Sequence, residues 1–184
     1  MERRSIHVRP VGAAAVARHY IRDLVYGAND GIITTFAVVA GVAGGALPNQ
    51  AVVVVGAANL FADGLSMGVG NLLAIRAHES ALASEQRPRE ETEPLRHATA
   101  TFLAFVVAGA VPLLPYVNPM GHGSHLAPSA VLTACALFGV GAARALVTTD
   151  RWWRAGLEML LMGALVAVTA YGAGAIGARL IAGR

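Results

Sequence analysis

Five long apolar stretches dominate the chain, and short polar segments separate them. They cover residues 24–46, 51–74, 97–117, 130–147 and 156–176. Each is 18 to 24 residues long, close to the ~20 residues that an α-helix needs to cross a bilayer. The pattern predicts an all-α integral membrane protein with five transmembrane helices and little room for a soluble domain.

The polar segments divide the chain around one five-span domain over residues 24–176. Residues 1–23 form a basic N-terminal segment, and residues 177–184 form a short tail. Within the N-terminal segment, 13–20 is either a short interfacial helix or an ordinary basic flank. The longest polar connection is 75–96, which is rich in acidic residues.

Prolines predict where two of the helices stop. The second helix is expected to continue to about Gln86, after which Pro88 and Pro94 interrupt helical structure. The third helix should kink or end near Pro112 and Pro115, because a proline inside a helix removes a backbone hydrogen bond.

Composition supports a membrane protein. Hydrophobic residues make up 55% of the chain and charged residues 14%, against about 25% charged in a typical soluble domain. This excludes intrinsic disorder, and a single cysteine excludes a disulfide scaffold. Glycine is abundant, and the pairs Gly27/Gly31 and Gly64/Gly68 allow close helix packing, within a subunit or across a dimer.

The arginines predict the orientation in the membrane. Twelve fall on one side, five in 1–23, four in 75–96 and three over 144–154. The connections 47–50 and 118–129 have none, and the C-terminal tail has two. By the positive-inside rule, the N-terminus is cytoplasmic and the C-terminus extracytoplasmic. The net charge of +3 is spread between the spans and is not a nucleic-acid-binding pattern.

Three acidic residues fall inside the apolar spans: Asp30, Asp63 and Glu158. An ionisable group in the membrane costs at least ~2.5–3.5 kcal/mol at mid-depth, so it indicates function by default. The competing interpretation is that these carboxylates only form hydrogen bonds between helices. Glu158 is the weakest candidate because it lies near the cytoplasmic end of its span.

Helical spacing places Asp63 in a longer polar stripe. Asn59, Asp63, Met67 and Asn71 recur every four residues, so they share one helix face. Carboxylate and amide oxygens with a thioether sulfur suit a divalent first-row metal such as Fe²⁺. Carboxylates that titrate also provide a basis for exchanging protons for a cation. A methionine at this position, taken alone, is more often a core packing residue than a metal ligand.

The 75–96 connection offers a second set of possible ligands. It contains Glu79, Glu90, Glu91 and Glu93 beside several arginines. These glutamates either form a solvated face that balances the arginines or collect metal on the cytoplasmic side.

At this point a family resemblance is visible. DLVYGANDGIITTFAVVAGVAGG and GAANLFADGLSMGVGNLLAIRAHE resemble the first two spans of the vacuolar iron transporter family, particularly its short bacterial members. FLAFVVAGAVPLLPY resembles that family's third span, and WWRAGLEMLLMGALVAVTAYGAG its last. The resemblance covers most of the chain, and the ANDG and ADGLSMGVGN segments are its most specific parts.

The resemblance implies a homodimer with a cation path near the two-fold interface. It implies export of Fe²⁺, and often Mn²⁺, from the cytosol with inward proton movement, here across a bacterial plasma membrane. The family's functional aspartate in the first-span DG pair corresponds to Asp30. Its functional methionine in the second-span SM pair corresponds to Met67.

The chain also departs from the family pattern. Larger members have a long glutamate-rich domain between spans two and three, whereas this chain has only residues 75–96. Some members place a glutamate two turns before the SM pair, where this chain has Asn59, and Asp63 is a candidate to replace that charge. These departures bear on metal choice, affinity and coupling.

The leading hypothesis is a divalent metal exporter for Fe²⁺ and/or Mn²⁺ driven by proton antiport. Its partners are the metal ion, protons, the lipid bilayer and a second copy of the chain, with no bound cofactor. The alternative is a non-transporting membrane interaction or scaffold protein, whose polar groups only hold helices together. An enzyme is not expected, because the spans contain no nucleophile–base pair or paired catalytic carboxylates.

Overall fold

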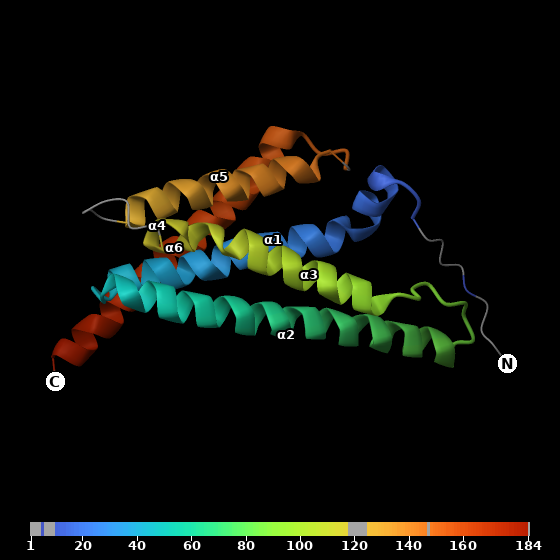
Figure 1. Ribbon diagram of the computed structural model, residues 1–184, viewed down its shortest axis with the longest axis horizontal. Helices are drawn as coiled ribbons and strands as arrows, with labels where there is room; N and C mark the ends of the chain where they lie inside the picture. Colours follow the sequence, from blue (N-terminus) through green and yellow to red (C-terminus); the bar gives the residue numbers. More distant parts are fainter. Residues whose placement is uncertain (1–4, 6–9, 118–124, 147, 184) are drawn as a thin grey trace.

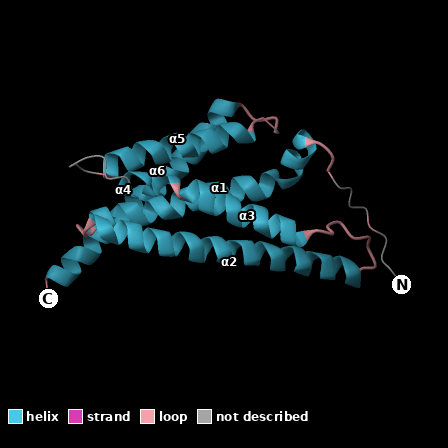
Figure 2. Cartoon of the chain, viewed as in Figure 1, coloured by secondary structure: helices cyan, strands magenta, loops and turns pink. Residues whose placement is uncertain are grey.

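The computed structural model describes residues 5, 10–117, 125–146 and 148–183. Within these residues all regular structure is helical, and five helical segments are long and apolar enough to cross a membrane, as the sequence predicts. Figure 2 shows these helices joined by short loops. The elements are α1 (Ala13–Gly44), α2 (Asn49–Ser84), α3 (Pro94–Gly109), the 3-10 turn η1 (Val111–Leu113), α4 (Leu114–Val117), α5 (Leu126–Arg144) and α6 (Trp152–Ala182).

The helix ends follow from local chemistry. α1 stops at two glycines, and Ala46 after them has a positive φ of 53°. α2 stops two residues before the expected Gln86, which itself has a positive φ of 56°. Pro94 occupies the first turn of α3, where its missing N–H costs nothing. The third span changes from α-helix to the 3-10 turn η1 around Pro112, which agrees with the prediction that the helix kinks or ends there.

Two helices extend beyond the predicted spans. α1 begins at Ala13, so the second half of the 1–23 segment is the first part of the spanning helix. α6 continues to Ala182, so most of the 177–184 tail is helical. Both helices are therefore longer than the apolar stretches that predicted them.

The helices lie side by side with α1 in the middle. It contacts α2 and α3 on one side and α5 and α6 on the other (Figure 1). The start of α1, the 75–96 connection and the α5–α6 turn lie at the same end of the bundle. The arginine-rich segments that predict the cytoplasmic side are therefore grouped at one end, although the orientation itself stays a prediction.

Glycines set the distance between α1, α2 and α3. A Cβ on Gly27 would lie 2.5 Å from the carbonyl oxygen of Thr101, and one on Gly68 3.0 Å from that of Ala98. Gly31 and Gly64 likewise face Phe105 of α3. The two small-residue pairs of the sequence therefore both serve packing against α3 within one subunit.

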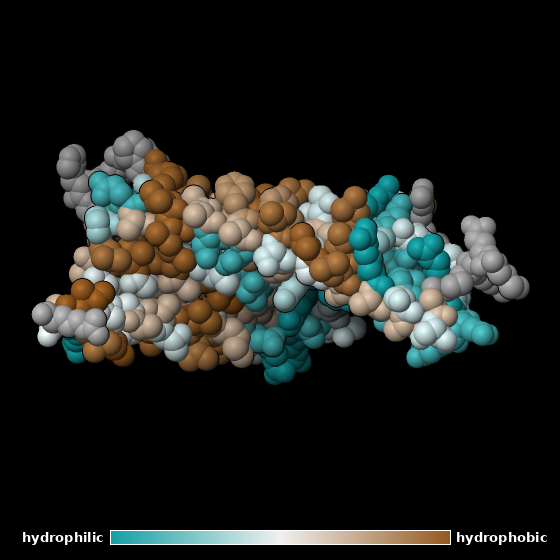
Figure 3. Space-filling view, turned by 90° about the horizontal axis from the view of Figure 1, so that it is seen from below, coloured by the Kyte–Doolittle hydropathy of each residue, from teal (hydrophilic) through white to brown (hydrophobic). Residues whose placement is uncertain are grey.

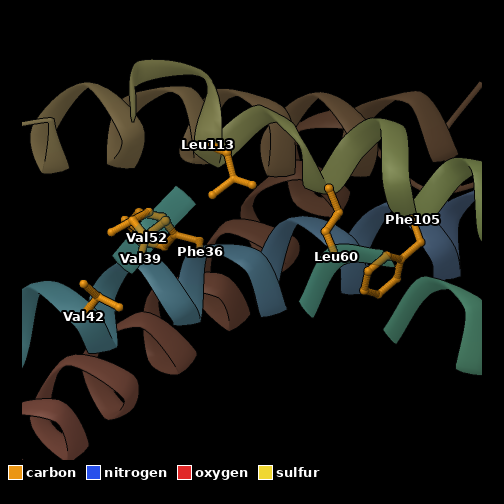
Figure 4. Packing of buried hydrophobic residues seen from close by; sticks show 7 residues of the cluster. All are labelled: Phe36, Val39, Val42, Val52, Leu60, Phe105 and Leu113. Carbon is orange, nitrogen blue, oxygen red and sulfur yellow. The ribbon is translucent and has the colours of Figure 1, made fainter. Parts of the chain in front are cut away.

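The core is a thin apolar layer between these helices. One cluster joins residues of four elements, namely Phe36, Val39, Val42, Val52, Leu60, Phe105 and Leu113 (Figure 4). A second joins Ile32, Leu137 and Met159. Many large apolar side chains point outwards, as expected of a protein surrounded by lipid. In Figure 3 hydrophobic residues cover much of the left and upper middle of this face, with hydrophilic patches between them, and hydrophilic residues gather at the end that holds the 75–96 connection.

Candidate functional site

Two of the acidic residues that the sequence singles out lie on neighbouring helices in the apolar part of the bundle. Asp30 lies on α1 and Asp63 on α2, and both side chains are half-buried. Because α1 and α2 are in contact, both carboxylates lie in the apolar part of the same bundle. Two like charges in this setting repel each other unless a proton or a cation lies between them.

The predicted stripe on α2 runs past this pair. Asn59, Asp63, Met67 and Asn71 are all half-buried on one helix face. Met67 packs against the larger core cluster, so it combines a packing contact with a position one turn from Asp63. Asn71 ends the stripe at a polar network, described below. The stripe thus connects the middle of the bundle with the end that holds the 75–96 connection.

Glu158 belongs to a different group of charges. Its exposed carboxylate accepts a hydrogen bond of 2.9 Å from Arg144, and Asp150 lies 3.4 Å from the same guanidinium. The described contacts therefore join Glu158 to the α5–α6 turn rather than to Asp30 or Asp63. A surface ion pair of this kind contributes little to stability.

The glutamates of the 75–96 connection organise its backbone. The buried Glu79 accepts hydrogen bonds from the N–H groups of Glu90 and Glu91, at 2.9 and 2.7 Å. Glu91 in turn accepts from Thr92 and Glu93, at 2.8 and 2.7 Å, just before α3 begins. Glu79 and Glu91 are therefore more than a solvated face, because they hold the connection against α2 and α3.

The other two loop glutamates form ion pairs. Glu90 lies 3.2 Å from both Arg87 and the ring of His78. Glu93 lies 3.0 Å from Arg96. This agrees with the interpretation that part of the acidic charge balances nearby arginines.

A polar network that the sequence did not predict lies directly behind this connection. The buried Asp23 of α1 lies 2.5 Å from Nδ1 of His97 on α3, across 74 residues of sequence. The side-chain amide of Asn71 on α2 donates hydrogen bonds to Asp23 and to the hydroxyl of Thr101, each with a donor–acceptor distance of 2.8 Å. One amide side chain thus ties α1, α2 and α3 together.

The sequence pattern does not single out Asp23, because this residue falls in the basic N-terminal segment. With 2% exposure it is more buried than Asp30 or Asp63, which are the acids that the sequence singled out. A signal was present: Asp23 lies seven residues before Asp30, which places both on nearly the same face of one helix.

The network borders a pocket of about 470 Å³ at this end of the bundle. Asp23, Asn71 and His97 line it, together with His19, Glu91 and others. The lining residues carry three carboxylates and one guanidinium. The carboxylates belong to Asp23, Glu90 and Glu91, and the guanidinium belongs to Arg22. The pocket therefore favours cations.

Comparison with known proteins identifies related sequences over most of the chain. The sequence model of the VIT family matches residues 21–92 and 77–175. Vacuolar iron transporter 2 of Oryza sativa subsp. japonica is 26% identical over 213 residues, covering 85% of this chain and 87% of that protein. Vacuolar iron transporter homolog 1 of the same organism is 30% identical over 177 residues, covering 88% and 75%. Vacuolar iron transporter 1 of Arabidopsis thaliana is 24% identical and covers 84% and 85%.

Proposed function

The chain belongs to the VIT family, and on this premise we propose that it exports Fe²⁺ and/or Mn²⁺ from the cytosol in exchange for protons. The relatives named vacuolar iron transporter support metal transport rather than catalysis. We further propose that the membrane is a bacterial plasma membrane.

The observation that carries the proposal is the pair of carboxylates between α1 and α2. Asp30 and Asp63 lie within the apolar spans of two contacting helices, where a charge is expensive unless it has a function. A divalent cation between them would neutralise both carboxylates, and a proton would do so in its absence. Alternation between these two states is the physical basis of antiport at one site.

Met67 and Asn59 extend the proposed path on either side of Asp63. A thioether sulfur adds preference for softer ions such as Fe²⁺ over Mg²⁺ or Ca²⁺, which favour oxygen ligands. Glu158 is the weakest part of the proposed path, because its carboxylate is bound to Arg144.

A homodimer is part of the same proposal. Asp30, Asp63 and Met67 are only half-buried in one subunit, so a single chain leaves their side of the bundle incompletely covered. Large apolar side chains such as Leu65 and Val69 are exposed on α2. A second copy against this helix would enclose the path and cover apolar surface at the same time.

Flux measurements in proteoliposomes test the proposal. The protein is reconstituted with a metal-quenched dye and a pH dye inside the vesicles, and Fe²⁺ under reducing conditions, Mn²⁺, Zn²⁺ and Mg²⁺ are added in turn. We expect Fe²⁺ or Mn²⁺ entry with opposite proton movement. Asp30→Asn and Asp63→Asn should each reduce this flux at least about tenfold.

Asp150→Asn is the matched control. It makes the same carboxylate-to-amide change at an exposed position of the α5–α6 turn, and it should keep wild-type flux. Full flux in Asp30→Asn would refute the proposed path. No flux of any metal through a well-folded wild-type protein would favour the interaction-protein alternative, and metal flux without proton movement would refute antiport.

A further inference from the structure

Three side chains from separate parts of the chain converge in the lining of the 470 Å³ pocket. They are His19 of α1, Glu91 of the 75–96 connection and His97 of α3. Oε2 of Glu91 lies 2.9 Å from Nε2 of His97 and 3.6 Å from Nε2 of His19. We propose that these residues bind a divalent transition-metal ion, at a site distinct from the Asp30–Asp63 pair.

The spacing of the ligand atoms suits such an ion. One ligand atom from each residue lies within 4.8 Å of the other two. Metal–ligand bonds of about 2.0–2.2 Å place ligand atoms about 3–3.5 Å apart in tetrahedral or octahedral geometry. Both Glu91 distances are already close to this range, so only a small inward movement of His19 completes the site.

His97 has the support that a metal-binding histidine usually has. Its Nδ1 donates a hydrogen bond to Asp23, because an ionised carboxylate only accepts, and its Nε2 points at Glu91 and the site. A bound metal ion would take the place of the hydrogen between Nε2 and Glu91. Asn71 holds the other oxygen of Asp23. A carboxylate behind the imidazole orients the ring and strengthens it as a ligand.

Glu91 is positioned just as firmly. Its Oε1 accepts two backbone hydrogen bonds from Thr92 and Glu93, which leaves Oε2 turned toward the two histidines. Glu79 holds the backbone N–H of Glu91 itself. Two of the three ligands are thus oriented by their own hydrogen bonds before any ion arrives, which lowers the cost of binding.

The ligand set selects a class of ion. Two imidazoles and one carboxylate suit Fe²⁺, Co²⁺, Ni²⁺ or Zn²⁺, whereas Mg²⁺ and Ca²⁺ prefer oxygen ligands alone. The same combination of two histidines and one carboxylate is typical of non-haem Fe²⁺ sites. The surplus of carboxylates around the pocket adds attraction for any cation.

The location suggests a role as the first binding site for the transported ion, a part of the inference that rests on the proposed function. Asp23 and Asn71 line the pocket, and the helix faces that carry them also carry Asp30 and Met67 further along. Asp23 and Asp30 are seven residues apart, which is about 10 Å along a helix. An ion leaving the His19–Glu91–His97 site would enter the polar stripe directly.

Metal binding by the full-length, tag-free protein in detergent micelles tests the site without any transport. Co²⁺ is the probe, followed by equilibrium dialysis and by its visible absorption, which reports ligation by histidine. The measurements are made in an Asp30→Asn background, so that the proposed path does not contribute. We expect one Co²⁺ per chain, with binding weakened at least about tenfold by His19→Ala and by Glu91→Gln.

Two further variants separate ligation from folding. Asp23→Asn should weaken binding about 10–100-fold, because it acts through the orientation of His97. His125→Ala removes an imidazole beside Tyr116, outside the pocket, and should bind Co²⁺ like the background protein. Circular dichroism confirms that each variant is folded.

The outcomes distinguish this site from the proposed transport. Unchanged Co²⁺ affinity in both His19→Ala and Glu91→Gln, or no binding by a folded background protein, would overturn the inference. Co²⁺ binding that persists while the wild type shows no metal flux would support the site and refute only its role as an entrance.

Discussion

The close approach of α1 and α3 at Gly27 makes a quantitative prediction for Gly27→Ala. The added Cβ would lie 2.5 Å from the carbonyl oxygen of Thr101 and 3.1 Å from Cβ of Ala104. Ordinary contact begins at 3.4 Å, so the two helices must separate by about 0.9 Å at this point, the difference between 3.4 and 2.5 Å. The obstacle is backbone, which cannot rotate away as a flexible side chain would.

The separation weakens the contacts around the crossing. A gap of 0.5–1 Å removes a quarter to a half of each dispersion contact, and overpacking of this kind costs about 1–3 kcal/mol. Alanine gains about 0.5–1 kcal/mol over glycine in a helix, which offsets part of the cost. We expect a net loss of about 1–2 kcal/mol, which lowers the unfolding temperature by about 2–8 °C for a chain of this size.

Gly70→Ala provides the matched control. It makes the same change in α2 at a position where a Cβ meets nothing within 4 Å. It should therefore be neutral or stabilising. Thermal unfolding in detergent, followed by circular dichroism, compares the two variants with the wild type. Equal unfolding temperatures for Gly27→Ala and Gly70→Ala would refute the reasoning that glycine sets the α1–α3 distance.

Two further predictions concern the polar network and the loop. Asn71→Leu removes the hydrogen bonds to Asp23 and Thr101. The free energy of unfolding in detergent should therefore be about 2–4 kcal/mol lower than that of the wild type. Wild-type stability would mean that these bonds do not hold the three helices together. Glu79→Ala removes the acceptor of two backbone N–H groups in the 75–96 connection. Local opening of this connection should become easier by at least about 1.4 kcal/mol, so its amide hydrogen exchange should accelerate at least about tenfold. Unchanged exchange, measured by mass spectrometry on peptides covering the loop, would contradict that role.

The spanning helices were predictable from the sequence because the signal is local. A run of about 20 apolar residues forms a helix in lipid whatever surrounds it, since every backbone group must find its partner within the segment. Pro94 and Pro112 act equally locally, and the structure starts α3 and narrows the third span at these residues. The start of α1 was less predictable, because residues 13–23 are helical without being apolar.

The candidate path was predictable in part. Asp30 and Asp63 stand out because charges are rare in membrane spans, and helical period relates Asp63 to Met67. Their role in transport remains a prediction. Glu158 met the same criterion, but its carboxylate lies beside Arg144, because a residue close to the end of a span can reach a charged turn.

The sequence by itself determined the number of spans, their limits to within a turn or two in most cases, and the family to which the chain belongs. Only the tertiary structure brought Asp23, Asn71 and His97 into one network, and Glu91 within reach of His19. Helix periodicity states which residues share a face of one helix, but not which face of another helix they meet. Which helix faces meet depends on where glycines allow two backbones to approach closely. The resulting contacts join residues as far as 74 positions apart in the sequence.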